Sequence, residues 1–132
     1  MGLNLVSQLN LNQPVIFLGQ VPHNKLAAYY QAADIFVRPS LSEGQGISFL
    51  EAMACGLPII ASPVGGIVDF LTDKQTGLFC QPHDPRDVAD KINLLLTDRV
   101  LYQHIQKKAL ELVTTRYSWD FIAEQMKKII LN

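Results

Sequence analysis

The chain alternates short, continuous apolar runs with longer segments in which apolar residues recur at every third or fourth position. The runs cover residues 15–18, 35–37, 59–61 and 78–80. Because these runs are continuously apolar instead of alternating with polar residues, they predict strands that are buried on both faces. Strands of this kind separated by helices predict an α/β fold, built on a parallel sheet of about four strands.

Helical periodicity predicts seven helices, and capping residues mark several of their ends. Asn24 is a candidate N-cap, Gly56 is typical of the residue just past a helix, and Pro85 suits a first helical position. The last three helices form a C-terminal helical tail that we expect to pack on the sheet. The predicted helices cover residues 3–9, 25–33, 46–55 and 67–71, then extend from Pro85, from a cap at Asp98 to about residue 115, and from a cap at Ser118.

Composition excludes several classes of protein. The 132 residues are 48% hydrophobic, which is enough apolar material for one domain with its own core. The net charge is −1, and the two basic doublets, Lys107-Lys108 and Lys127-Lys128, fall in helical patterns as solvated faces, so no nucleic-acid partner is expected. The N-terminus lacks a signal-peptide pattern, and no apolar run approaches membrane-spanning length. We therefore expect a cytoplasmic protein.

The stretch from Glu43 to Glu51 carries the candidate chemistry. Gly44 and Gly46 let the backbone approach a ligand closely, and they lie between a predicted strand and a predicted helix. This order presents backbone N–H groups and the positive end of a helix to phosphate. Glu51 falls on a small polar stripe of the helix, where a carboxylate suits sugar hydroxyls. The alternative is that Glu51 is simply a solvent-exposed helix residue.

The run EGQGISFLEAMACGLPIIAS, residues 43–62, together with Pro39-Ser40, resembles the donor-binding motif of the family 4 retaining glycosyltransferases. The flanking segments are similar to the same family. Residues 15–19 with Val21-Pro22 resemble its upstream strand and turn, and residues 64–67 and 76–79 resemble its downstream loops. Tyr117-Ser118-Trp119 resembles the start of its final helix. The resemblance therefore extends over nearly the whole chain.

The resemblance implies that residues 1–132 form part of the C-terminal domain of a GT-B enzyme, a Rossmann-like domain that binds a nucleotide-diphosphate sugar as donor substrate. It also implies a role for each matching position. The implied catalytic residue is Glu43, in contact with the transferred sugar. The implied donor-binding residues are Gly44, Gln45, Gly46, Ile47 and Ser48 for the sugar hydroxyls and diphosphate, Glu51 for the ribose, and Val21 near the base.

No metal or cofactor is expected. The resemblance implies no divalent metal at the reaction centre, and the residues contain no ligand motif that contradicts it. His23, His83 and His104 are far apart in sequence, and we expect each to be a cap or a surface residue. Cys55 and Cys80 lack metal-ligand spacing and lie among apolar residues, which predicts small buried side chains in a reducing compartment.

The chain departs from the family pattern in three places. Gln45 stands where the family usually has an aromatic residue, and Val68-Asp69 stands where it usually has Pro-Glu. Arg38 replaces a residue that is commonly apolar. Arg38 could reach a phosphate, but a strand-end arginine that faces solvent is the more economical interpretation. Gln45 makes the loop more polar and could change contacts on the acceptor side.

The family also has two further strands and a basic pair upstream, which neutralises the leaving diphosphate, and an N-terminal acceptor domain. We expect the chain alone to be inactive, since loss of such cations removes much electrostatic stabilisation. The first hypothesis is thus that the chain is part of a retaining glycosyltransferase that builds a polysaccharide or glycolipid. The intact enzyme would then work at the inner face of the membrane. The alternatives are a non-catalytic module that docks on another chain or on itself, and an epimerase.

Overall fold

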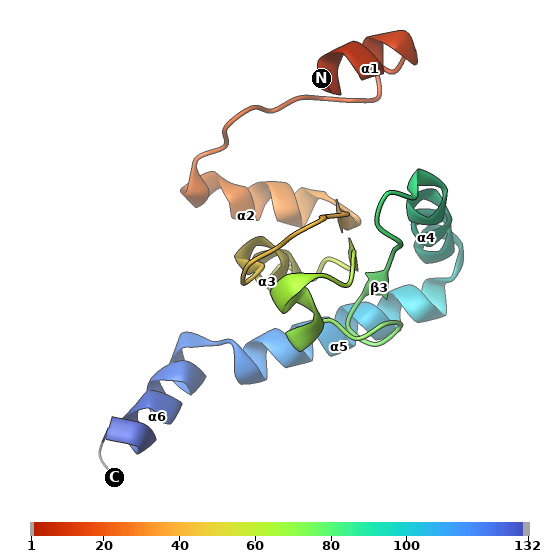
Figure 1. The fold of residues 1–132 in the computed structure, drawn as a ribbon. Coiled ribbons are helices and arrows are strands. Elements are labelled where there is room, and N and C mark those ends of the chain that lie inside the picture. The colour runs from red at the N-terminus through yellow and green to blue at the C-terminus, as the bar shows by residue number, and fades with distance from the viewer. Residues whose placement is uncertain (1, 131–132) are drawn as a thin grey trace.

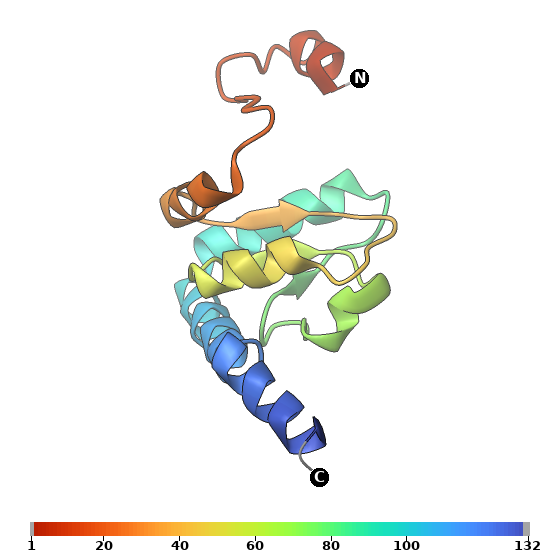
Figure 2. The same ribbon diagram turned by 90° about the vertical axis from the view of Figure 1, so that its left-hand side faces the viewer.

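The computed structural model describes residues 2–130, which form helices on both sides of a small parallel sheet (Figures 1 and 2). The chain begins with α1 (Gly2–Gln8) and α2 (His23–Ala32). The sheet consists of β1 (Phe36–Arg38), β2 (Ile59–Ala61) and β3 (Leu78–Phe79), and α3 (Ile47–Ala54) connects its first two strands. The remaining elements are η1 (Gly65–Asp69), a 3-10 helix, and then α4 (Pro85–Thr97), α5 (Arg99–Arg116) and α6 (Trp119–Ile130).

The sheet has the order β1-β2-β3, and both pairs of strands are parallel. Phe36 lies opposite Ile59, and Ile60 lies opposite Leu78. The α/β class and the helical C-terminal tail predicted from the sequence are therefore confirmed. The number of strands in the described residues is three, one fewer than predicted.

The missing strand is the run over residues 15–18, for which the prediction was wrong. These residues form an extended connection without regular structure, and Ile16 and Phe17 are 77% and 54% exposed. A strand is stable only when a neighbouring strand satisfies its backbone N–H and C=O groups. The three-stranded sheet does not reach this segment, and α1 stands apart at its far end (Figures 1 and 2).

Two apolar layers cover the two faces of the sheet, and β2 contributes to both. Ile59 and Ala61 face a layer formed with α3, η1 and α5, whereas Ile60 faces a second layer formed with α4 and α5. All three residues of β2 are completely buried. This explains why the strands are continuously apolar, because in a parallel sheet each face needs its own cover.

Several predicted helix ends are confirmed. Asp84 is the N-cap of α4, where its carboxylate accepts from the backbone N–H groups of Arg86 and Asp87, with Pro85 in the first helical position. Asp98 likewise accepts from the N–H of Leu101 at the start of α5. Ser118 accepts from the N–H of Phe121 in α6. These local signals were correct because capping depends only on neighbouring residues.

Two other predicted ends were wrong. Asn24 is not the N-cap of α2, since the helix begins one residue earlier at His23 and Pro22 occupies the cap position without a side-chain bond. The short helix predicted over residues 67–71 is the 3-10 helix η1, which begins at Gly65. Among residues 2–130, the helices are each too short or too polar to cross a lipid bilayer.

Candidate functional site

The centre of the candidate site is the loop that connects β1 to α3. Gly46 is the residue before α3, and its left-handed φ of 68° turns the chain sharply into the helix. A Cβ at this position would also lie 3.1 Å from the Phe49 ring, so glycine suits both the conformation and the space. The first N–H groups of any α-helix lack an intrahelical acceptor. Those of α3, at Ile47 and Ser48, are thus available to an anion.

A second glycine-containing turn, at Gly65 and Gly66, packs against the backbone of this loop. The N–H of Gly66 donates to the carbonyl oxygen of Gly44 over 3.1 Å. A Cβ on Gly66 would lie 2.5 Å from the same oxygen, and one on Gly65 would overlap the carbonyl oxygen of Glu43. The two turns therefore touch backbone to backbone, and the position of the loop that connects β1 to α3 depends on the absence of side chains at residues 65 and 66.

An open cavity of about 970 Å³ lies beside the loop, which is near the upper end of the range for small-molecule sites. It extends from the start of α2, across the α3 face, to the junction of α5 and α6. Its walls are largely apolar, with a few polar groups. The lining residues are His23, Gly44, Gln45, Ile47, Leu50, Glu51, Ala54, Gly66, Asp69, Val113, Thr114, Tyr117, Ser118, Trp119 and Ile122.

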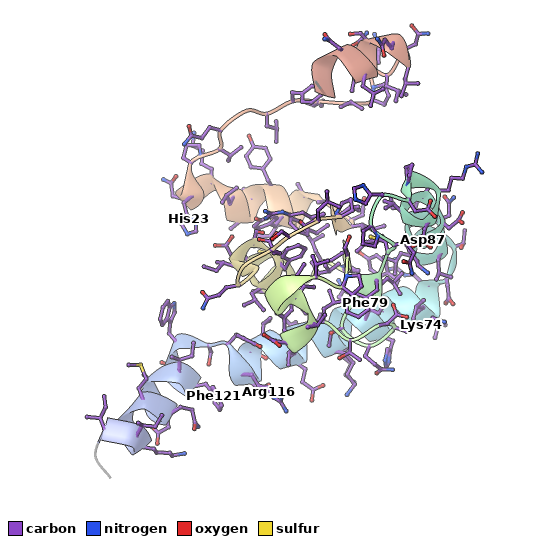
Figure 3. The ribbon with its side chains drawn as sticks, in the orientation of Figure 1. His23, Lys74, Phe79, Asp87, Arg116 and Phe121 are labelled. Atoms are coloured by element: carbon purple, nitrogen blue, oxygen red, sulfur yellow. The ribbon has the colours of Figure 1, made fainter. Side chains whose placement is uncertain are left out.

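Glu51 faces this cavity and is also tied to α2. Its side chain is 30% exposed, and one carboxylate oxygen lies 3.8 Å from Nδ1 of His23, at the beginning of α2 (Figure 3). Tyr30 lies about two turns beyond His23 on the same face of α2. The pKa of Tyr30 is raised, mainly by burial of the phenol and also by the negative charge of Glu51. Glu51 therefore lines the cavity with a half-buried carboxylate, and it is not simply a solvent-exposed helix residue.

Glu43 is the more buried of the two carboxylates, with its side chain 14% exposed. Oε2 of Glu43 lies 3.2 Å from Nη2 of Arg38 and accepts from the Ser40 hydroxyl over 3.2 Å. Arg38 also donates from Nη1 to the Ser48 hydroxyl over 2.8 Å. Arg38 is 47% exposed, as expected of an arginine that faces solvent, and it also contacts the loop and the first turn of α3.

The structure brings most of the predicted site residues together. Gly44, Gln45, Ile47 and Glu51 line the cavity. Glu43, Gly46 and Ser48 lie in the same loop and helix start, but outside the cavity wall. Val21 is half-buried in the segment just before α2, and it also lies outside the wall. The roles that the family resemblance implies for all these residues stay predictions.

Sequence reasoning missed several residues that share the cavity. His23 is a surface residue, as expected, with its side chain 84% exposed, but its position beside Glu51 was not predicted. Asp69 joins the cavity from η1, Tyr117 from the residue just after α5, and Trp119 from α6. Only the family resemblance provided a sequence signal for them, as a departure at Val68-Asp69 and a match at Tyr117-Ser118-Trp119. Their sequence distance from Glu51 hides the contact, because it depends on how α5 packs across α3.

Within residues 2–130, no three His, Cys, Asp or Glu side chains gather closely enough to hold a metal ion. The donors near the loop are one arginine, two hydroxyls and backbone N–H groups. Such groups recognise phosphate and hydroxyl oxygens. A reaction centre without a divalent metal stays a prediction.

Comparison with known proteins agrees with this geometry. A parallel α/β sheet with a glycine-rich loop leading into a helix defines the nucleotide-binding class of α/β domains. The family model described as Glycosyl transferases group 1 matches residues 3–112. The chain therefore belongs to the glycosyl transferases group 1 family, as its sequence motifs predict.

Three similar proteins indicate the extent of the match. An uncharacterised glycosyltransferase of Methanocaldococcus jannaschii is 36% identical over 92% of this chain and 31% of its own length. Sucrose-phosphate synthase from Thermosynechococcus elongatus superposes with a TM-score of 0.88 at 39% identity, covering 96% of this chain and 32% of that one. HepE from Anabaena, solved in complex with UDP-glucose, has a TM-score of 0.88 at 24% identity, covering 96% and 35%. The chain thus spans about a third of these proteins.

Proposed function

We propose that this chain is the nucleotide-sugar-binding part of a retaining glycosyltransferase that transfers a sugar to a polysaccharide or glycolipid acceptor. The observation that supports this most is the arrangement of the loop, the start of α3 and Glu51 around one cavity. A diphosphate placed at the start of α3 would meet N–H groups and the positive end of the helix dipole. The HepE structure, which contains UDP-glucose, supports a nucleotide-diphosphate sugar as the class of donor.

In this proposal each carboxylate binds a different part of the donor. Glu51 accepts hydrogen bonds from the ribose hydroxyls, and Glu43 accepts from hydroxyls of the transferred sugar. The backbone of residues 44–48 binds the diphosphate, which gains negative charge as the bond from the anomeric carbon to the phosphate oxygen breaks. N–H groups fixed before the reaction stabilise this charge without reorganising.

Donor binding is the step to test on the 132 residues, because the similar proteins are about three times as long. The backbone N–H signals of residues 43–51 should shift in NMR spectra on addition of UDP, GDP or ADP. The nucleotide that binds most tightly identifies the base of the donor. If millimolar amounts of all three leave these signals unchanged, the chain does not bind a donor by itself.

The Glu51→Ala change should weaken binding of the preferred nucleotide by roughly tenfold or more, because hydrogen bonds to a charged group are among the strong ones. Calorimetry with the nucleotide and with its 2′-deoxy form measures the effect. The wild-type chain should prefer the ribose form, and the variant should lose that preference. Asp90→Asn, on the exposed side of α4, is the matched control and should retain it. A variant that still discriminates the 2′-hydroxyl would contradict the role given to Glu51.

A second candidate function is a non-catalytic module that docks on a further copy of the chain. It is favoured by Ile16, Phe17 and Leu18, a run of exposed apolar side chains with unpaired extended backbone. Light scattering after size-exclusion chromatography should then give a mass above that of one chain. Phe17→Lys should restore the monomer, whereas Val100→Lys, at an exposed apolar position of α5, should not. A wild-type monomer at high concentration would exclude self-association.

A further inference from the structure

Arg38 occupies an unusual position at the end of β1. Side chains alternate along a strand, so Arg38 lies on the same face of the sheet as Phe36 and points toward α3. Its guanidinium lies 5.6 Å from the centre of the Phe49 ring, donates to the Ser48 hydroxyl over 2.8 Å, and lies 3.2 Å from Oε2 of Glu43. One side chain therefore connects the loop, the first turn of α3 and the aromatic core.

The contacts of Glu43 are arranged asymmetrically. Within residues 2–130, its ion-pair partner Arg38 and its hydrogen-bond donor Ser40 both meet the same oxygen, Oε2. A carboxylate held through one oxygen has a fixed plane, and its second oxygen, Oε1, then has a fixed direction. The carboxylate is also 14% exposed, so little solvent screens its charge.

That charge would be unfavourable for a nucleotide-sugar. In the proposed function, the sugar that Glu43 contacts is bonded through its anomeric carbon to a diphosphate that carries negative charge of its own. A guanidinium against Oε2 offsets the repulsion between the two anions and leaves Oε1 as the acceptor. Arginine suits this task because its planar fork can meet Ser48 and Glu43 at the same time, and it stays charged at every physiological pH.

We propose that Arg38 is a positioning residue of the donor site: it holds Oε2 of Glu43 so that Oε1 accepts from the hydroxyls of the transferred sugar. This inference rests on the proposed function. It assigns Arg38 a task toward the sugar half of the donor, acting through Glu43, and none toward the nucleotide half.

The test compares two ligands on each variant. The probes are UDP-glucose, GDP-mannose and ADP-glucose, and the one that binds the wild-type chain most tightly is measured beside its own nucleoside diphosphate. Arg38→Leu should weaken binding of the nucleotide-sugar by roughly tenfold, because Glu43 loses its ion-pair partner and presents an unpaired charge to the donor. Binding of the nucleoside diphosphate should weaken by less than about twofold. Arg38→Lys should fall in between, since an ammonium keeps the charge but cannot span both partners.

A double-mutant cycle separates positioning from direct contact. In the Glu43→Gln background, Arg38→Leu should have no further effect on the nucleotide-sugar, because residues that act through one another are not additive. Arg99→Leu removes an arginine of α5 that also lies over an aromatic ring, that of Tyr102 in the same helix, and it should leave the binding of both ligands unaffected. If Arg38→Leu does not fold, the cycle is completed with Arg38→Lys.

Each other result overturns the proposal in a different way. Equal loss of both ligands on Arg38→Leu would place Arg38 against the diphosphate. An effect that persists with Gln at position 43 would mean that Arg38 meets the sugar itself. Unchanged affinity would show that the contact between Arg38 and Glu43 has no role in binding. A wild-type chain that binds no nucleotide-sugar and no nucleotide would overturn the proposed function and this inference together.

Discussion

Gly65→Ala should destabilise the chain by about 2–4 kcal/mol and distort the loop between β1 and α3. Gly65 has a φ of +55°, and a Cβ there would overlap the carbonyl oxygen of Glu43. The conformational cost and the steric cost fall on the same residue. Because Glu43 belongs to the loop that must move, binding of nucleotide and nucleotide-sugar should both weaken. Urea unfolding and calorimetry measure the two effects.

Gly44→Ala provides the matched control for this change. Gly44 is in the loop that Gly65 touches, but a Cβ at residue 44 would have open space around it, and its φ lies outside the left-handed region. Its free energy of unfolding should stay within about 0.5 kcal/mol of wild type, as for most surface changes. Equal unfolding midpoints for Gly65→Ala and Gly44→Ala would contradict the backbone contact between the two turns.

Phe49→Ala should cost about 3–5 kcal/mol of stability, a large part of the 5–15 kcal/mol typical of a single domain. Phe49 is completely buried. Its ring centre lies 5.4 Å from that of Phe36 and 6.3 Å from that of Phe70, and Arg38 lies over its face. Truncation therefore leaves a cavity beside the loop between β1 and α3, and it removes the ring against which the Arg38 guanidinium packs.

Phe17→Ala is the control for Phe49→Ala, since it removes the same atoms from a residue that is 54% exposed. Its effect on the urea midpoint should be small. The slope of the unfolding transition should be the same for both variants, which shows that the midpoint reports stability rather than a change in the unfolded chain. A Phe49→Ala midpoint no lower than that of Phe17→Ala would mean that the aromatic cluster contributes little.

Much of the fold could be predicted because its signals are local. Asp84 with Pro85 marks the start of α4 by direct hydrogen bonding and fixed φ. The apolar run Ile59–Ala61 is a strand because both of its faces find cover. The run over residues 15–18 is also continuously apolar, yet it forms no strand. Apolar composition records a tendency to be buried, whereas a strand also requires a neighbour with free backbone groups.

The candidate site shows the same division. The order of strand, glycine loop and helix is local, so the loop at Gly44–Gly46 and the start of α3 could be located from sequence. The partners of its carboxylates could not. His23 reaches Glu51 because α2 packs beside α3, and Arg38 reaches Glu43 because the loop folds back over β1. Such contacts follow from tertiary packing, which short-range patterns do not encode.

The junction of α5 and α6 offers a way to observe ligand binding in the cavity beside α3. Trp119, the first residue of α6, is the only tryptophan in the sequence. Its side chain is 85% exposed and forms part of the wall that also contains Glu51. Indole emission depends on the polarity around the ring, so the fluorescence of the unlabelled chain comes from one place. A ligand that fills the cavity and covers the indole ring should therefore change the wavelength and intensity of this emission, so that Trp119 would report when the cavity is occupied.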